Sequence, residues 1–140
     1  MNSKRKGDIA EMIAQLYFLE RNYSVSVPVG DNDKYDFIVD TGDKLLKIQV
    51  KSGNIKDDRM VIELSTRTHS SGSKNNRTQV NKYNDGDFDW LVAVDVASKQ
   101  CYFIPPEKSI NKTQITLRLG TRNVNNPNIN WADEYRKIGL

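Results

Sequence analysis

One short stretch of the sequence combines residue types that could do metal-dependent chemistry on a phosphate. Residues 35–52 read YDFIVDTGDKLLKIQVKS, and within them Asp36 is followed by Gln49 and Lys51. Hydrolysis of a phosphodiester bond needs a hard cation to hold a phosphate oxygen and to activate water. Mg²⁺ prefers oxygen ligands, usually one or two carboxylates, and a nearby ammonium group can neutralise the developing charge. These residue types therefore indicate phosphodiester hydrolysis, provided that the chain brings them together.

A β-hairpin over residues 35–52 would bring them together. Residues 42–43, Gly-Asp, suit the centre of a two-residue turn because glycine readily adopts a positive φ. With this turn, Asp36 lies directly opposite Gln49, and in such a pair the Cβ atoms are about 4.5–5.5 Å apart. Lys51 lies on the same face because alternate side chains of a strand point the same way. The side chains predicted to point into the core are those of Leu46, Ile48 and Val50.

A helix is predicted just before the hairpin, over residues 7–21, with Asp8 as its N-cap. Apolar residues recur in it at the spacing of one helical face. This apolar stripe consists of Ile9, Met12, Ile13, Leu16 and Tyr17. Glu11 lies off the stripe, and Ala14 and Phe18 share its side of the helix at i+3 and i+7. We therefore expect the helix to be covered on more than one face and Glu11 to be partly buried. If the helix packs beside the hairpin, Glu11 is a second acid for the same site.

The rest of the chain predicts a sheet. Strands are expected at residues 22–29, 59–65, 88–96, 101–105 and 114–119, and a short helix within residues 126–136. Pro28 confines the first strand to an edge or a strand end. Residues 59–65 are expected to form the third strand of a meander with the hairpin, and residues 66–82 a long polar loop with a helical turn near Thr78–Tyr83. Residues 88–96 are apolar enough to be buried on both faces. A helix followed by a mostly antiparallel sheet indicates the α+β or mixed α/β class.

Length and composition limit the other possibilities. A chain of 140 residues is expected to form a single domain over residues 1–140. The one cysteine excludes an internal disulfide framework and a thiolate zinc cluster. The one histidine argues against a histidine-based metal nuclease and against a Ser–His–Asp hydrolase. We find no signal peptide and no apolar run of membrane-spanning length. We therefore expect a soluble protein without membrane contacts, in the cytoplasm of a bacterial cell or in an organelle interior.

Positive charge is concentrated in two stretches. The net charge is only +3, but residues 64–84 and 108–132 contain lysines and arginines and no acid. Such stretches are typical of a surface that binds phosphates. They are equally typical of ordinary solvated loops. The charge pattern alone does not decide between the two interpretations.

The motif places the chain beside a known superfamily. Asp-x(12)-Gln-x-Lys on a hairpin, preceded by a helix with a glutamate, resembles the core of the PD-(D/E)XK nucleases. Residues 6–53 look particularly like the group I intron-encoded homing endonucleases of that superfamily. Residues 87–105 and 116–119 are similar to the second half of the same proteins. The resemblance implies a restriction-endonuclease-like α/β core, with a mixed sheet flanked by helices, and cleavage of double-stranded DNA with Mg²⁺.

The resemblance also implies roles for particular residues. It assigns catalysis to Glu11, Asp36, Gln49 and Lys51, and the Mg²⁺ ligands to Asp36, Gln49, Glu11 and the Val50 carbonyl. Two positions depart from the usual motif. Tyr35 stands where the superfamily often has proline, at a position that binds no metal. Gln49 replaces the usual second acid and contributes no charge, so metal binding is expected to be weaker unless Glu11 compensates.

The leading hypothesis is therefore a site-specific, Mg²⁺-dependent homing endonuclease with a long double-stranded target. The predicted DNA contacts are Arg67, Lys74, Asn75, Asn76, Arg77 and Gln79 in the loop, and Arg118, Arg122 and Asn123 as a second group. Because one active site cuts one strand, we expect a homodimer, or a homotetramer built as a dimer of dimers for a long target.

Three alternatives stay open at this point. The first is a structure-specific nuclease of the same fold, similar to the Holliday junction resolvases. The second is a catalytically weakened DNA-binding module in which Gln49 has replaced a metal ligand. In the third, the motif has no catalytic role, because an aspartate and a lysine on a hairpin are most often an exposed ion pair that stabilises the fold by under about 1 kcal/mol.

Overall fold

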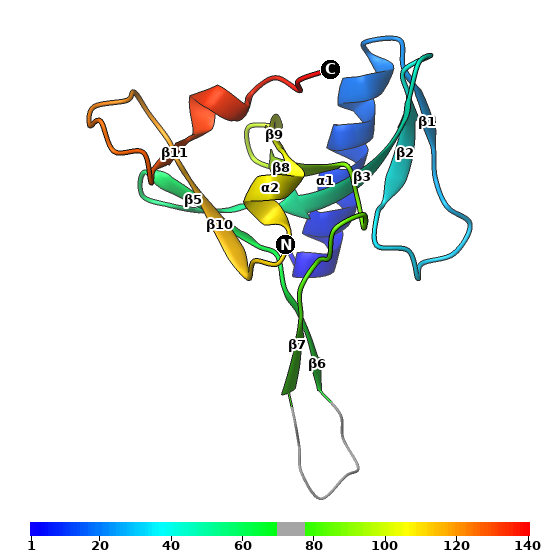
Figure 1. Ribbon diagram of the computed structural model, residues 1–140, viewed down its shortest axis with the longest axis horizontal. Coiled ribbons are helices and arrows are strands. Elements are labelled where there is room, and N and C mark those ends of the chain that lie inside the picture. Colours follow the sequence, from blue (N-terminus) through cyan, green and yellow to red (C-terminus); the bar gives the residue numbers. More distant parts are fainter. Residues whose placement is uncertain (70–77) are drawn as a thin grey trace, which may run out of the picture.

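The computed structural model of the protein describes residues 1–69 and 78–140. Helix α1, Ser3–Leu19, packs on one face of a five-stranded sheet, and a second sheet covers the other face (Figure 1). The first sheet has the order β1 Ser24–Ser26, β2 Phe37–Asp40, β3 Leu45–Ser52, β8 Trp90–Asp95 and β9 Gln100–Ile104. The second has the order β11 Asn130–Trp131, β10 Gln114–Arg118, β5 Arg59–Glu63 and β4 Asn54–Lys56. Both sheets are mixed, because β3 pairs with β8, and β10 with β11, in parallel.

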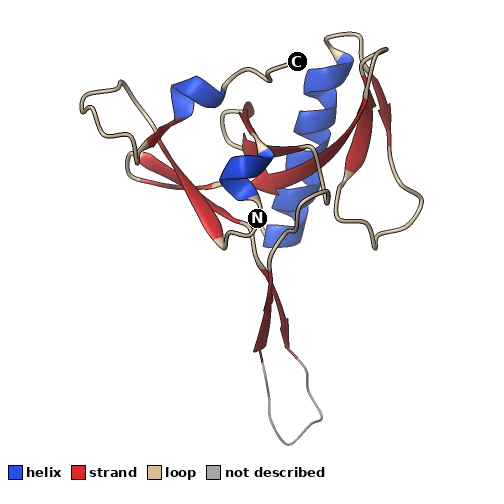
Figure 2. Cartoon of the chain, in the orientation of Figure 1, coloured by secondary structure: helices blue, strands red, loops and turns tan. Residues whose placement is uncertain are grey.

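The remaining elements of the described residues are a two-stranded ribbon and two short helices (Figure 2). Strands β6, Thr66–His69, and β7, Thr78–Asn81, form a separate two-stranded ribbon that extends away from the two sheets (Figure 1). A short helix α2, Pro106–Ser109, follows β9, and a 3₁₀ helix η1, Ala132–Tyr135, follows β11. The α/β class and the mixed sheet flanked by helices are confirmed. The five-stranded sheet is also mostly antiparallel, as expected, with the β3–β8 pair at its centre as the parallel exception.

The β2–β3 hairpin has the predicted register. Phe37 pairs with Ile48 and Asp40 with Leu45, and Thr41 N donates to Lys44 O at 2.9 Å to close the turn. Gly42 has φ +92°, which explains why the turn needs glycine. Leu46, Ile48 and Val50 are buried in the core against α1, as predicted. Strand β1 lies at the edge of the sheet, also as predicted.

Helix α1 begins earlier than predicted and, as predicted, is covered on more than one face. Asn2, not Asp8, is the N-cap, and its side chain accepts a hydrogen bond from Arg5 N. The helix ends in a Schellman-type pair of hydrogen bonds at Asn22, which has φ +64°. The fully buried residues of the helix are Ala10, Ala14 and Phe18. The small alanines let the helix lie close to the sheet. Of the predicted stripe, Ile13 and Tyr17 pack against the same core, whereas Met12 and Leu16 are exposed.

Strand β8 is buried on both faces, as predicted. Val92 and Val94 join the core under α1, whereas Leu91 and Ala93 join the core under the second sheet. Strand β9 pairs with it antiparallel, as expected from the intervening turn. The central strands are therefore held between two cores, and β3, which carries the predicted site, is one of them.

Residues 59–65 do not form the third strand of the hairpin's meander, so this prediction is wrong. Strand β5 pairs instead with β4 and β10 in the second sheet. The reason is that β8 already occupies the free edge of β3. The chain leaves β3 through Gly53, where an added Cβ would lie 2.6 Å from Met60 Cγ, and it then turns back at Asp57, which has φ +55°.

Residues 66–82 are not simply a polar loop, and the helical turn predicted near Thr78–Tyr83 is also wrong. The two ends of this segment pair as β6 and β7, with Thr66 opposite Asn81 and His69 opposite Thr78. Regular pairing satisfies the backbone groups of β7 across the ribbon, which outweighs the weak helical tendency of this short segment.

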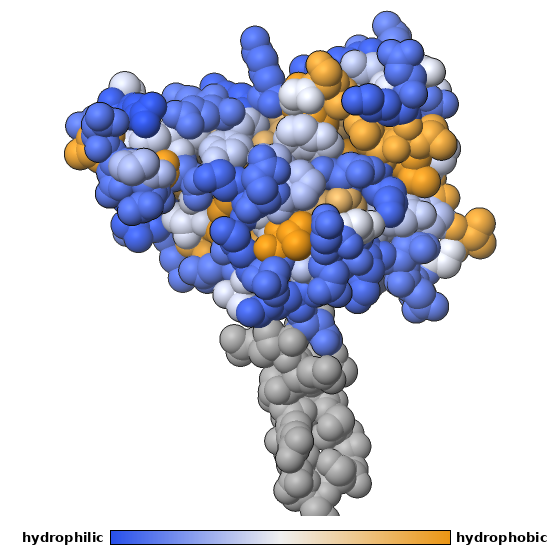
Figure 3. All heavy atoms as spheres, viewed as in Figure 1, coloured by the Kyte–Doolittle hydropathy of each residue, from blue (hydrophilic) through white to orange (hydrophobic). Residues whose placement is uncertain are grey.

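The surface is mostly hydrophilic, with apolar atoms gathered on the side where α1, β1 and β2 lie (Figure 3). On α1 the exposed apolar residues are Met12, Leu16 and Leu19. In the described part of the chain, no helix is long and apolar enough to span a bilayer.

Candidate active site

The hairpin brings Asp36 and Gln49 to the same place. Asp36 lies just before β2, and its backbone N donates to Ile48 O at 2.7 Å. Its carboxylate Oδ2 accepts a hydrogen bond from Val50 N, also at 2.7 Å. Gln49 is only 8% exposed, and its Nε2 donates to Val50 O at 3.3 Å. The acid, the amide and the Val50 carbonyl therefore form one polar cluster on two neighbouring strands.

Lys51 lies near this cluster without forming an ion pair with it. Among the side chains that the structure describes, none lies within salt-bridge or hydrogen-bond distance of its ammonium group. The ammonium instead faces the ring of Tyr83, with Nζ 5.5 Å from the ring centroid. Burial lowers the pKa of Lys51, and the nearby Asp36 carboxylate opposes this by raising it.

Glu11 comes to the site from α1. Glu11 and Asp36 both line a cavity of about 200 Å³, together with residues of the loop between β1 and β2. The pKa of Glu11 is raised, first because the side chain is partly buried and second because Asp36 and Asp8 are near. The prediction that Glu11 lies beside the hairpin, partly buried, is confirmed.

The environment of Asp36 disfavours its negative charge. Burial raises the pKa of this carboxyl group, and this effect exceeds the opposing effects of the Val50 N–H and of Lys51. Two acids with raised pKa values and a lysine with a lowered pKa thus lie close together. Removal from water is the largest cause of each pKa shift, and it favours the neutral form of all three groups. Titratable groups with shifted pKa values that lie close together are typical of a functional site.

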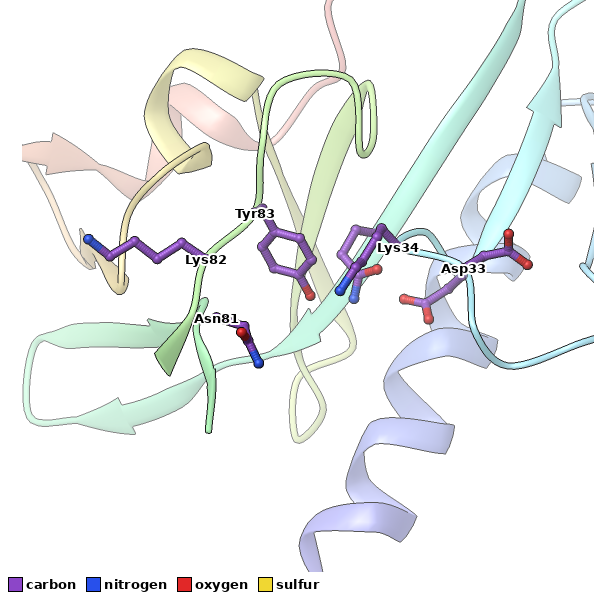
Figure 4. A pocket seen from close by; sticks show the side chains of 7 residues that line it. Asp33, Lys34, Asn81, Lys82 and Tyr83 are labelled. Carbon is purple, nitrogen blue, oxygen red and sulfur yellow. The ribbon is translucent and has the colours of Figure 1, made fainter. Parts of the chain in front are cut away.

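Asp36 also lines a second cavity, of about 180 Å³, which Figure 4 shows from close by. It is lined by Asp33, Lys34, Asp36, Gln49, Asn81, Lys82 and Tyr83. The Tyr83 ring projects from the segment after β7 into this space, with its hydroxyl group toward Lys34 (Figure 4). Burial and the nearby Asp36 raise the pKa of Tyr83 to about 12. No local sequence pattern indicates a role for Tyr83, because only the fold brings it beside the hairpin.

The oxygen atoms at this site suit a hard cation. Asp36 and Glu11 supply carboxylates, and Gln49 and the Val50 carbonyl lie next to them. Among the described residues, no three His, Cys, Asp or Glu side chains cluster where they could share a metal ion. A site with few protein ligands is compatible with Mg²⁺, which keeps several waters and also takes oxygens of its substrate.

The predicted DNA-binding residues fall into separate regions. Arg67 lies in β6 and Gln79 in β7, whereas Lys74, Asn75, Asn76 and Arg77 lie outside the described residues. Arg118 Nη1 lies 3.7 Å from Asp58 Oδ2, and Arg122 Nη1 lies 3.1 Å from Glu134 Oε1. Asn123 is exposed in the loop after β10. This loop lies well away from the β6–β7 ribbon (Figure 1), so the structure does not bring the two predicted groups together.

The comparisons with known proteins agree with this fold. A family model described as PD-(D/E)XK endonuclease matches residues 1–138. A solved structure, "The structure of a bacterial homing endonuclease: I-Ssp6803I", superposes with a TM-score of 0.77 at 29% sequence identity, covering 97% of this chain and 89% of that chain. No curated protein sequence matches the chain. The resemblance that the sequence suggested is confirmed. The chain therefore belongs to the PD-(D/E)XK endonuclease family and is a nuclease that hydrolyses DNA.

Proposed function

We propose that the protein is a Mg²⁺-dependent, site-specific endonuclease of the intron-homing type, acting on a long double-stranded DNA target. The observation that carries the proposal is the convergence of Asp36, Gln49 and Lys51 from one hairpin with Glu11 from α1. The likeness to a bacterial homing endonuclease supports the homing role. Because the family match makes the chain a nuclease, a DNA-binding module without activity is no longer a competing interpretation.

In this proposal Asp36, Gln49, Glu11 and the Val50 carbonyl hold the metal ion. Nucleases of this family generally use divalent cations, usually Mg²⁺. When bound, the ion supplies Lewis-acid polarisation of the scissile phosphate. The hydrogen bond from Val50 N fixes the Asp36 carboxylate on the hairpin, so the ligand is held in place before the substrate arrives. Lys51 places its ammonium group beside the same phosphate and stabilises the charge that develops there.

The ribbon of β6 and β7 is the proposed DNA-reading element. It extends from the body of the protein, and the segment that follows β7 lines the cavity beside Asp36 (Figure 1). A two-stranded ribbon fits the major groove of B-DNA. We propose that Arg67, Lys74 and Arg77 contact phosphates or guanine edges, and that Asn75, Asn76 and Gln79 read adenine edges.

We further propose that the protein acts as a homodimer or as a dimer of dimers, because each active site cuts one strand. The exposed apolar face of α1 is the proposed contact between two copies. A groove on this face is lined by Ile9, Met12, Ile13, Leu16 and Leu19, together with Asp8 and Lys99. Asp8 lies toward the start of the helix, whereas Lys99 also borders the end of the helix near Glu20 and Arg21. In a two-fold contact of antiparallel helices, each Asp8 would therefore face the partner's Lys99.

The test is cleavage of a randomised duplex library with Mg²⁺, followed by sequencing of the products. We expect cuts at one long sequence for the wild type, and a rate at least about 100-fold lower for Asp36→Asn and for Lys51→Ala. Unchanged cutting by both variants would dismiss the proposed site. A four-way junction that competes better than the linear target would favour the Holliday junction resolvase instead.

A further inference from the structure

Tyr83 is held rigidly beside the candidate active site. Its side chain is only 8% exposed, and its ring packs edge-on against Phe88 with the centroids 5.1 Å apart and the planes at 79°. Its backbone carbonyl accepts a hydrogen bond from Asn111 N at 2.8 Å. The backbone and the ring are therefore both fixed by neighbours other than the hairpin.

Lys51, by contrast, has a long side chain with few restraints. In the described part of the structure its ammonium group forms no ion pair and donates no hydrogen bond. Its polar contact is the face of Tyr83, at 5.5 Å from Nζ to the ring centroid. This distance lies within the range in which a cation is attracted to the negative face of an aromatic ring.

We propose that Tyr83 is the positioning residue of Lys51, and that its ring holds the ammonium group at the edge of the cavity that Asp36 and Gln49 line. This inference rests on the proposed function, because it assumes that Lys51 acts on the scissile phosphate. The ring, and not the hydroxyl group, performs this role, since the ring face is what Nζ contacts.

The role follows from the flexibility of lysine. A lysine side chain has many rotamers, and catalysis requires its charge at one place relative to the phosphate. Burial near Asp36 restricts where the group can lie but does not fix Nζ, because no carboxylate of residues 1–69 and 78–140 is close enough to pair with it. A rigid ring on the opposite wall of the site restricts the remaining freedom.

Two substitutions distinguish the effect of the Tyr83 ring on the cleavage rate from that of its hydroxyl group. Tyr83→Phe keeps the ring, and we expect the single-turnover cleavage rate to stay within about threefold of wild type. Tyr83→Leu removes the ring, and we expect the rate to fall by about 10- to 100-fold with unchanged DNA affinity, since misplacement by about 1 Å can cost 100-fold. Thermal unfolding of each variant establishes that the assay temperature lies below its Tm.

The decisive comparison is made in the Lys51→Ala background. If Tyr83 acts through Lys51, adding Tyr83→Leu to Lys51→Ala should leave the residual rate unchanged, because the two residues act as a unit. The inference would be overturned if Tyr83→Leu lowered the rate by the same factor in the Lys51→Ala background as in the wild type. It would also be overturned if Tyr83→Leu alone cut at the wild-type rate, or if Tyr83→Phe lost as much activity as Tyr83→Leu.

A spectroscopic readout is independent of whether Tyr83→Leu folds. In the wild type and in Tyr83→Phe, the Lys51 Hε resonance, identified by its loss in Lys51→Ala, should lie upfield of the resonances of lysines that face no aromatic ring; Lys47, over the Tyr35 ring, is left out of this comparison. An Hε shift within the lysine average would overturn the inference. The outcomes also separate the two proposals: wild-type cutting by Lys51→Ala defeats the proposed site, whereas an inactive Lys51→Ala with a fully active Tyr83→Leu defeats only the role of Tyr83.

Discussion

The Asp36 carboxylate accepts a hydrogen bond from the backbone N of Val50 at 2.7 Å, across the two strands of the hairpin. This bond fixes the carboxylate beside Gln49 on the central part of the sheet. It does not remove the cost of burial, because the pKa of Asp36 is still raised. The position that suits the proposed metal ion is therefore unfavourable for the carboxylate when no cation is present.

Asp36→Asn is expected to stabilise the protein in a chelating buffer at neutral pH. In the unfolded chain Asp36 ionises near its ordinary pKa of 3.8, whereas in the folded protein its pKa is higher. The folded state therefore loses stability as the pH rises through the interval between these two pKa values, and above it the loss is constant. The asparagine Oδ1 can still accept the hydrogen bond from Val50 N, and it carries no charge.

The measurement is the Tm of both proteins between pH 3 and pH 8. The variant should unfold at a higher temperature at pH 8, and the difference should shrink as the pH falls. Asp43→Asn, in the exposed turn of the same hairpin, is the matched control and should show no such difference. A variant less stable than wild type at pH 8 would contradict the prediction.

Gln49→Glu should strengthen divalent metal binding. A second carboxylate would face Asp36 directly and add a charged ligand, so we expect the Mg²⁺ concentration for half-maximal cutting to fall by about tenfold. Without metal, the two like charges on opposed residues should lower the Tm. Gln49→Leu, which fills the same space without an oxygen ligand, should raise the Mg²⁺ requirement. An unchanged Mg²⁺ requirement in both variants would remove Gln49 from the proposed ligands.

The salt dependence of DNA binding tests the proposed role of the β6–β7 ribbon. Each phosphate contact contributes about 0.9 to the slope of log K against log salt, so Lys74→Ala combined with Arg77→Ala should reduce the slope by about 2. Arg122→Ala is the comparison, because Arg122 already pairs with Glu134, and its loss should change the slope less. Binding is measured by fluorescence anisotropy in the Asp36→Asn background, which prevents cutting. If Arg122→Ala reduced the salt slope more than the double variant did, the DNA would be bound by the loop after β10 and not by the β6–β7 ribbon.

Gly53→Ala should destabilise the fold where β3 leaves the first sheet. An added Cβ would overlap the side chain of Met60, which is fully buried and has little room to move. Overpacking of this kind costs about 1–3 kcal/mol, which corresponds to a fall in Tm of about 3–10 °C. Gly7→Ala is the control. Gly7 lies in α1, and a Cβ added there would have no neighbouring atom within 4 Å. That variant should be stabilised by about 0.5–1 kcal/mol, and equal Tm changes in both variants would refute the steric argument.

Leu16→Glu should dissociate the proposed dimer. Leu16 is 53% exposed on the apolar face of α1, so the substitution does not disturb the core but places a charge in the proposed contact. Light scattering coupled to size-exclusion chromatography should show half the wild-type mass. Val124→Glu, at an exposed apolar residue of the loop after β10, should keep the wild-type mass. A monomeric wild type in the presence of its DNA would refute the proposed contact.

The sequence predicted the hairpin and its polar face well because both depend on local rules. The position of Gly42 sets the turn, and strict alternation then sets which side chains share a face. The same rules could not place β5, because its partner was decided by competition between distant strands for the edge of β3.

The errors on α1 and at Tyr83 have related causes. The helix carries apolar residues on more than one face, so periodicity indicated that the side of Ala14 and Phe18 is covered, but not that Ala10, Ala14 and Phe18 are its fully buried residues. Close approach to the sheet favours small residues, and that requirement belongs to the tertiary structure. Tyr83 reaches the site only because the chain returns from the β6–β7 ribbon to the edge of the hairpin, which no local pattern indicates.

Strand β7 ends at Asn81, and the very next residues, Lys82 and Tyr83, line the cavity beside Asp36. Target choice and turnover would then be mechanically linked in this scaffold. An engineer who transplants the ribbon from a relative must decide whether the graft ends before Asn81 or after Tyr83. The first choice keeps Lys82 and Tyr83 of this protein in the wall of the cavity, whereas the second replaces them with the relative's residues. Retargeted enzymes made in these two ways should therefore differ in cleavage rate even when they recognise the same DNA.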